Sequence, residues 1–194
     1  METVNIYIVG TAGSGKTALA GALQLWMRNR GLEVVMVNLD PGAEQLPYQP
    51  DIDIRDWLKL GDIMNEYGLG PNGAQILCAD LIALNVEEIR EELGSFESPY
   101  AVFDTPGQIE LFAFRPAFKM SISALGRRSF MAFLLDPMLA RSPEGFISLS
   151  LLSASTQFRF GLPSLNLLSK MDLLDREELE KITGWVDSES LNQA

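Results

Sequence analysis

The residues best suited to chemistry form a glycine-rich segment near the N-terminus. It begins at Gly10 and ends at Gly15-Lys16-Thr17, which is the spacing of a P-loop. In such a loop, successive backbone N–H groups turn toward a phosphate, and small residues let the loop close tightly around it. We expect Lys16 to reach the β- and γ-phosphates and the Thr17 hydroxyl to bind Mg²⁺. The predicted phosphate cradle is Gly10, Thr11, Ala12, Gly13, Ser14, Gly15, Lys16 and Thr17.

The elements on either side of this segment favour nucleotide binding over an ordinary glycine-rich turn. Alternating apolar residues at Val4, Ile6 and Ile8 predict a strand before it. A helical stretch follows over 17–30, with Gly31 as its C-cap. The N-terminus of that helix would direct the positive end of its dipole at the phosphate.

A second chemical motif is Asp104-Thr105-Pro106-Gly107-Gln108, which follows an apolar strand beginning at Tyr100. A carboxylate at Asp104 can hold Mg²⁺, and the Gly107 N–H can donate to a γ-phosphate. Gln108 can orient the attacking water. The chain has no histidine, which is no obstacle, because several phosphoryl-transfer enzymes place the water with an amide.

Two other apolar strands also end in carboxylates, at Asp40 and Asp172. In open α/β sheets, ligands bind beyond the carboxyl ends of the strands, so Asp40 is expected near the phosphates. Asp40-Pro41-Gly42 is alternatively a routine turn that ends a strand. Within Ser169-Lys170-Met171-Asp172, the Asp172 carboxylate can accept two hydrogen bonds from guanine that adenine cannot supply, and the Lys170 stem can cover the base.

The middle of the chain carries weaker signals. No helical pattern is evident over 45–59, which predicts an extended surface segment and a candidate switch region. Pro-Asn-Gly within residues 68–73 indicates a tight turn, or a rigid turn that holds the Asn72 amide outward for a phosphate or a partner. A helix is expected to begin after Asp80 as its N-cap and to stop at Gly94.

Composition limits the classes of function. The 194 residues are 47% hydrophobic and 21% charged, which indicates one globular domain over 1–194 with an inserted segment at about 45–94. A net charge of −11 argues against direct nucleic-acid binding and anionic membranes. The sequence shows neither a signal peptide nor a membrane-spanning run. A single cysteine suits a cytoplasmic protein, and the absence of histidine excludes histidine triads.

Taken together, these motifs resemble those of the GPN-loop GTPases, small P-loop proteins of archaea and eukaryotes. The resemblance runs along nearly the whole chain, and the order and spacing of its motifs are highly specific. The motifs are Gly10-Thr11-Ala12-Gly13-Ser14-Gly15-Lys16-Thr17, Val37-Asn38-Leu39-Asp40-Pro41, Leu46-Pro47-Tyr48, Asp53-Ile54-Arg55, Gly70-Pro71-Asn72, Asp104-Thr105-Pro106-Gly107-Gln108 and Lys170-Met171-Asp172-Leu173-Leu174.

The resemblance implies a doubly wound α/β fold with a mostly parallel sheet, a P-loop and a GPN-loop insertion. It implies a homodimer that binds GTP or GDP with Mg²⁺ and hydrolyses GTP. The Gly70-Pro71-Asn72 loop of one subunit would reach toward the phosphates held by the other. Asp40, as base, and Gln108 would handle the attacking water, so the implied catalytic residues are Lys16, Asp40, Asn72 and Gln108.

Two features depart from the family pattern. Ser169 stands where the guanine motif usually begins with Asn, and the family continues beyond the last helix here, so the C-terminal part of the family domain is expected to be missing. Two alternatives stay open. One is an ATP-using enzyme of the same scaffold, an ATPase or small-substrate kinase. The other is a nucleotide-gated assembly factor with little turnover, for which the resemblance implies RNA polymerase subunits or assembly chaperones as partners.

Overall fold

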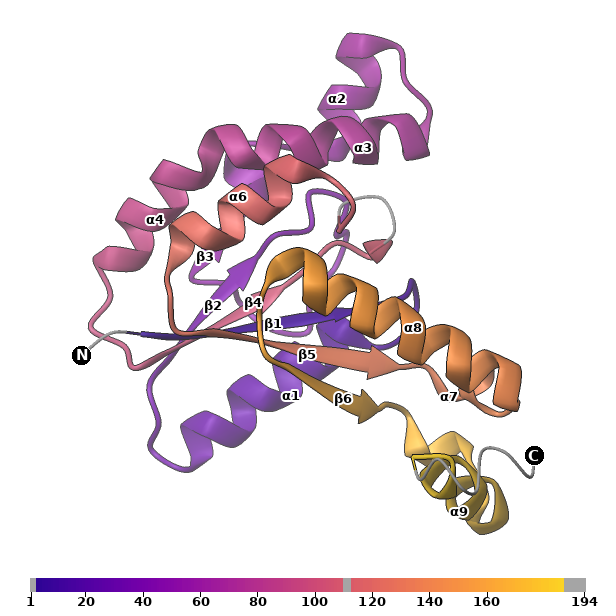
Figure 1. The fold of residues 1–194 in the computed structure, drawn as a ribbon. Helices are drawn as coiled ribbons and strands as arrows, with labels where there is room; N and C mark the ends of the chain where they lie inside the picture. Colours follow the sequence, from indigo (N-terminus) through magenta and orange to yellow (C-terminus); the bar gives the residue numbers. More distant parts are fainter. Residues whose placement is uncertain (1–2, 110–112, 187–194) are drawn as a thin grey trace.

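A parallel β-sheet forms the centre of the molecule in the computed structural model, which describes residues 3–109 and 113–186 (Figure 1). Within this part of the chain the sheet has six strands in the order β3-β2-β4-β1-β5-β6, and every neighbouring pair is parallel. The strands are β1 Val4–Gly10, β2 Val34–Asn38, β3 Ile52–Asp53, β4 Tyr100–Asp104, β5 Ser129–Leu135 and β6 Ser164–Leu168.

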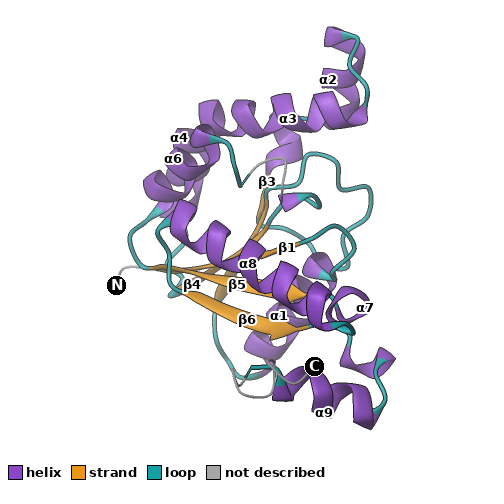
Figure 2. Cartoon of the chain, turned by 45° about the vertical axis from the view of Figure 1, so that its right-hand side comes forward, coloured by secondary structure: helices purple, strands orange, loops and turns teal. Residues whose placement is uncertain are grey.

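Helices cover both faces of this sheet, as the doubly wound prediction requires (Figures 1 and 2). Helix α1 packs on one face, and α3, α4, α6 and α8 lie on the other. No described helix is long and apolar enough to cross a membrane. The helices are α1 Lys16–Asn29, α2 Leu60–Tyr67, α3 Pro71–Ile82, α4 Val86–Gly94, α6 Pro116–Leu125, α7 Pro137–Ala140, α8 Pro143–Phe160 and α9 Arg176–Gly184.

The central strand β1 shows why the sheet must be covered twice. Its side chains alternate between two hydrophobic clusters, with Tyr7 in one and Ile8 in the other, and both are fully buried. Tyr7 stacks on Phe103 of β4 with ring centroids 4.5 Å apart. A strand buried on both faces and paired on both edges has little freedom to move, so the loop that follows it at Gly10 begins from a rigid support.

The insertion between β3 and β4 differs from the sequence prediction. The tight-turn interpretation of 68–73 is wrong in part, because Gly68 ends α2 in a left-handed conformation and Pro71 is already the first residue of α3. Asp80 is no N-cap, since it lies inside α3 and forms an ion pair with Arg115. Gly94 does end α4, as predicted.

The segment over 45–59 contains no α-helix, as predicted, but it does not simply run over the surface. Its apolar side chains Tyr48, Ile52, Ile54 and Leu58 are all buried. Burial of alternate side chains holds this segment against the sheet, with Ile52–Asp53 as the edge strand β3 beside β2.

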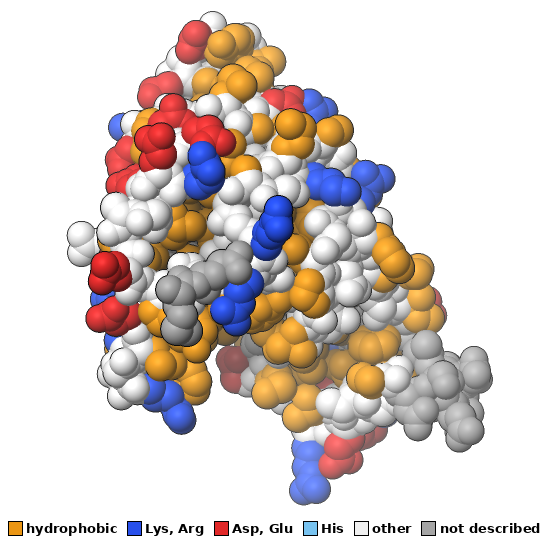
Figure 3. Space-filling view, turned by 60° about the vertical axis from the view of Figure 1, so that its left-hand side comes forward, with side chains coloured by type: hydrophobic (Ala, Val, Ile, Leu, Met, Phe, Trp, Pro, Cys, Tyr) orange, Lys and Arg blue, Asp and Glu red, His pale blue; other side chains and the backbone are white. Residues whose placement is uncertain are grey.

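Charge is unevenly spread over the surface. Acidic side chains gather in the upper part of the face in Figure 3, at the height of the α2–α4 insertion. On α4, Glu87, Glu88 and Glu91 are exposed. Acidic side chains grouped in this way repel the phosphates of a nucleic acid.

Candidate functional site

The P-loop lies at the carboxyl end of β1, where it turns into α1. A side chain at Gly10 would place its Cβ 2.7 Å from the Ser14 hydroxyl oxygen and 2.9 Å from the Leu134 carbonyl oxygen. Gly15 caps the N-terminus of α1 with φ 97°, a backbone conformation that glycine adopts without strain. Both glycines therefore meet physical requirements of the loop, as its spacing predicts.

Lys16 lies within the curve of this loop and is 5% exposed. Its Nζ donates to the carbonyl oxygens of Gly10 at 3.0 Å, Thr11 at 2.8 Å and Gly107 at 2.9 Å. The lysine therefore joins the P-loop to the loop that follows β4. A phosphate entering here would find its cation already positioned.

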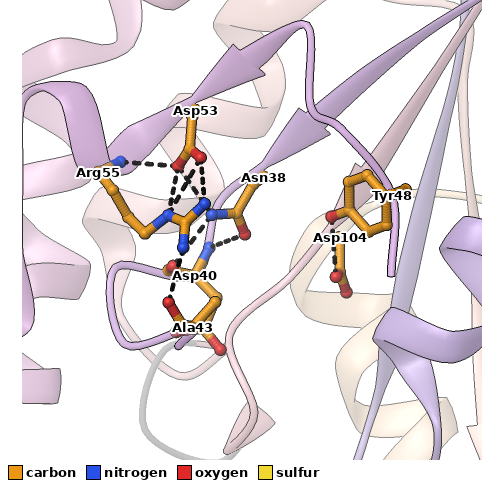
Figure 4. A network of polar contacts seen from close by, with 7 residues as sticks. All are labelled: Asn38, Asp40, Ala43, Tyr48, Asp53, Arg55 and Asp104. Atoms are coloured by element: carbon orange, nitrogen blue, oxygen red, sulfur yellow. Dashed lines mark hydrogen bonds and ion pairs between the residues drawn. The ribbon is translucent and has the colours of Figure 1, made fainter. Parts of the chain in front are cut away.

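Asp104, at the end of β4, is 1% exposed and accepts a hydrogen bond from the Tyr48 hydroxyl at 3.0 Å (Figure 4). Burial raises the pKa of Asp104 to about 6, against the lowering effects of hydrogen bonds from Thr17 and Tyr48. Its Oδ1 is buried and has no hydrogen-bond partner among the described residues. A buried carboxylate oxygen left in this way, with a threonine hydroxyl beside it, fits a Mg²⁺ site.

Asp40 is held in place by a chain of polar contacts (Figure 4). Its backbone N–H donates to Asn38 Oδ1 at 3.0 Å, and Asn38 Nδ2 donates to Asp53 Oδ1 at 2.9 Å. Arg55 pairs with Asp53 and donates through Nη1 to the Ala43 carbonyl at 2.8 Å. The network joins the end of β2, the 40–43 turn and the end of β3.

The Asp40 carboxylate lies in an environment that suits a base. Burial raises its pKa, while the N–H groups of Gly42 and Gly107 and the charges of Lys16 and Arg55 oppose that rise. The Gly42 N–H is 2.8 Å from Oδ1. The Gly107 N–H, expected to face a γ-phosphate, bonds the Asp40 carboxylate in this structure.

The structure brings Asp40 and Gln108 together although 67 residues separate them along the chain. Both line one small cavity beneath α3. The two residues expected to handle water are therefore neighbours in the folded chain.

A larger cavity, of about 650 Å³, joins the P-loop to the segment after β6. Ser14 and Gly15 line one side, and Ser169, Lys170 and Asp172 line the other. The remaining lining is largely apolar and comes from α1 and from the ends of β5 and β6: Ala18, Leu19, Ala22, Leu134, Leu167, Leu168 and Met171. A nucleobase has flat apolar faces and a polar edge, so it would fit a cavity with such a lining.

Two details of this cavity concern the guanine motif. The Ser169 hydroxyl donates to the Leu135 carbonyl at 3.1 Å, so it ties the motif to β5. Lys170 has φ 45° and forms an ion pair of 2.8 Å with Asp136. This pair fixes the lysine stem at the cavity wall next to Gly15, where an added Cβ would lie 3.7 Å from the Lys170 Cε.

Gly70, Pro71 and Asn72 are exposed at the N-terminus of α3. They lie where α2 and α3 meet, a hairpin that projects from the top of the molecule in Figure 1. They line neither of the two cavities just described. The structure thus brings together the other predicted site residues within one chain, but it leaves this loop facing outward.

Sequence reasoning assigned no role to several residues of the site. Tyr48 and Asp136 bond Asp104 and Lys170, respectively, and Asn38 anchors the Asp40 turn. A signal existed for Asn38, because it is the polar residue at the end of an otherwise apolar buried strand. Tyr48 belongs to the Leu46-Pro47-Tyr48 motif, but nothing in that motif indicates its hydrogen bond to Asp104, which lies 56 residues away.

Comparisons with known proteins identify relatives along the whole chain. A family model described as "Conserved hypothetical ATP binding protein" matches residues 8–194. GPN-loop GTPase 3 of Schizosaccharomyces pombe is 36% identical over 178 residues, covering 90% of this chain and 64% of that protein. GPN-loop GTPase 3 of Saccharomyces cerevisiae is 33% identical over 207 residues, covering 100% of this chain and 76% of that protein.

A solved structure matches the fold closely. PAB0955 from Pyrococcus abyssi, a GTPase in its apo form, superposes with a TM-score of 0.88 at 32% identity. The match covers 97% of this chain and 76% of that one.

Proposed function

This chain belongs to the GPN-loop GTPase family, and on that premise we propose that it binds GTP and hydrolyses it to GDP and phosphate. The observation that carries the proposal is the cavity that places Asp172 opposite the P-loop residues Ser14 and Gly15. One continuous pocket thus connects the P-loop, which would hold the phosphates, with Asp172, which would bind the base. The guanine preference rests on Asp172, whose carboxylate accepts from the guanine N1 and exocyclic amino groups.

Phosphate binding is assigned to the P-loop N–H groups, the N-terminus of α1 and Lys16. Lys16 would exchange its carbonyl partners for phosphate oxygens, since both are acceptors. Thr17 and Asp104 would hold Mg²⁺, which when bound neutralises charge on the phosphates. The buried, unpartnered Oδ1 of Asp104 supports that assignment.

Water handling is assigned to Asp40 and Gln108. Burial raises the pKa of Asp40 toward the operating pH, which makes its carboxylate a stronger base for the proton of an attacking water. Gln108 lines the same cavity and would orient that water through its amide. The Asn38–Asp53–Arg55 network would keep the carboxylate in place.

We further propose that the protein works as a homodimeric switch. Gly70-Pro71-Asn72 is exposed, and Pro71 at the first position of α3 fixes the backbone there. A loop of this kind can present the Asn72 amide to the phosphates of a second copy with little loss of entropy. Nucleotide state would then act on subunit geometry through that contact.

An ATP-using enzyme is the competing proposal, since the description of the matching family model names ATP. The two proposals differ at Asp172. A carboxylate repels the lone pair of adenine N1 and pairs with the guanine N1–H, so the ATP proposal leaves Asp172 without a role.

The deciding experiment measures GTP and ATP turnover with Mg²⁺ by the purified protein, beside light scattering for its mass. We expect GTP turnover well above ATP turnover, by a dimer, with loss in Lys16→Ala. Lys181→Ala, which removes an exposed lysine of α9, is the matched control and should retain activity. Equal turnover of both nucleotides, or activity that survives Lys16→Ala, would overturn the proposal.

A further inference from the structure

Helix α3 covers both of the loops that carry the water-handling residues. The small cavity beneath it is lined by Gln75 and Cys78 from the helix, and by Asp40 and Gln108 from the loops after β2 and β4. The remaining lining is apolar. Its volume of about 10 Å³ is close to the smallest that holds one water molecule.

Gln75, which lines this cavity, has an unsatisfied polar atom. Its Oε1 is buried and has no hydrogen-bond partner among the described residues. A buried amide oxygen without a partner is costly, and in folded proteins such atoms are usually satisfied by protein groups or by ordered water. A water molecule both donates and accepts, so it can satisfy either end of the amide.

We propose that Gln75 is a positioning residue for hydrolysis, which holds one water molecule between its own amide, the Asp40 carboxylate and Gln108. That water would donate to Gln75 and Asp40 and accept from the Gln108 amide. It would thereby fix the orientation of both side chains before the nucleotide arrives. The inference rests on the proposed GTP hydrolysis by the same site.

The position of Gln75 also gives α3 two roles. Asn72 and Gln75 lie one helical turn apart, with Asn72 exposed and the Gln75 oxygen buried. A contact at Asn72 that shifts the helix therefore shifts the water held by Gln75. The exposed Asn72 and the buried amide of Gln75 both belong to the first turns of α3, so they would move together.

The test compares Gln75→Leu with Gln24→Leu in the full chain. Gln24, on α1, also carries a buried amide atom without a described partner, but it is no part of the site. For Gln75→Leu we expect kcat for GTP to fall about tenfold, the effect of losing one hydrogen bond at the transition state. GTP affinity should not change, and Tm should not fall, because leucine suits the apolar lining. Gln24→Leu should retain the wild-type kcat.

The possible failures can be told apart. If the wild type itself does not hydrolyse GTP, the proposed function fails. If the wild type is active and Gln75→Leu has the same kcat, the role of Gln75 fails alone. Parallel losses of kcat, GTP affinity and Tm would reduce Gln75 to a packing residue. A crystal structure that resolves ordered water gives a readout independent of turnover: a water between Gln75, Asp40 and Gln108 is expected, and a dry cavity would overturn the inference.

Discussion

Two regions of the site are built in different ways. The nucleotide-holding region, residues 10–17 with residues 169–172, consists of two continuous segments at the ends of buried strands. In the water-handling region, side-chain hydrogen bonds between separate segments hold the Asp40 turn, and Gln108 lines the same cavity as Asp40. Main-chain geometry is fixed once the sheet forms, whereas a side-chain network depends on every member. Binding should therefore survive changes that abolish hydrolysis.

Lys16 is where the two regions touch. Its Nζ contacts Thr11 in the P-loop and Gly107 beside Gln108. Substitution of Lys16 should affect both binding and turnover, so variants elsewhere are needed to separate the regions.

The largest expected effect comes from Asp40→Asn. The amide keeps the shape of the side chain but cannot accept the proton, so kcat for GTP should fall roughly a thousandfold. GTP affinity should stay within about threefold of the wild type, because no P-loop group changes. Single-turnover kinetics and nucleotide titration measure the two quantities. Asp56→Asn, an exposed acid nearby, is the control and should behave as the wild type. If Asp40→Asn lowered GTP affinity as well as kcat, the two regions would not be separate.

Asp172→Asn should act on the other region. It replaces the acceptor for the two guanine hydrogens, and hydrogen bonds to a charged group contribute about 1.5–3 kcal/mol each. We expect the preference for GTP over ATP in kcat/KM to fall about a hundredfold, with the change mainly in KM. Glu177→Gln on α9 removes the same charge from an exposed pair and should leave the preference intact. An unchanged preference would remove Asp172 from base recognition.

Arg55→Met tests the supporting network. The substitution removes the ion pair with Asp53 and the hydrogen bond to the Ala43 carbonyl, which loosens the Asp40 turn. We expect kcat to fall about tenfold with KM unchanged. Arg55 also lowers the pKa of Asp40, so the acidic limb of the pH–rate profile should move to higher pH. Arg90→Met, which removes an exposed ion pair on α4, is the matched control. A fall in kcat with no shift of the acidic limb of the pH–rate profile would contradict the effect of Arg55 on the pKa of Asp40.

Tyr48→Phe should have the smallest effect, and on stability. The Tyr48 hydrogen bond stabilises the ionised form of Asp104, whose pKa is about 6. The pKa of Asp104 in the unfolded chain is lower, so folding favours the protonated carboxyl group. The ionised carboxylate therefore lowers the free energy of unfolding above pH 6, and this loss of stability fades toward pH 4. Loss of the hydroxyl should cost about 2 kcal/mol at pH 8 and less at pH 5. Thermal unfolding at the two pH values measures this, and equal costs would contradict it.

The nucleotide-holding region could be predicted from sequence because each of its parts is local. An apolar strand, a glycine-rich loop and a helix follow one another in the chain, so the pattern and its geometry coincide. Asp172 lies across one cavity from the P-loop because the carboxyl ends of parallel strands meet at one edge of a sheet. The capping box of α9, formed by Asp175 and Glu178, depends on an equally local pattern.

The remainder depends on contacts between distant residues. The Tyr48–Asp104 hydrogen bond and the cavity that Gln75 and Asp40 both line leave no periodic pattern in the sequence. In the insertion, Pro71-Asn72-Gly73 is compatible both with a turn and with a helix start, and the packing of α3 on α2 and α6 decides between them. Local propensity alone therefore does not predict the start of α3, because it cannot include that packing.

The double variant Asp40→Asn/Asp172→Asn tests most directly whether the two regions are independent. The measured quantity is kcat/KM for GTP in the wild type, both single variants and the double variant. Independent regions predict that the double variant's loss equals the product of the two single losses, within about twofold. A double variant no worse than Asp40→Asn alone would contradict the account, since it would mean that base recognition and water handling act as one unit.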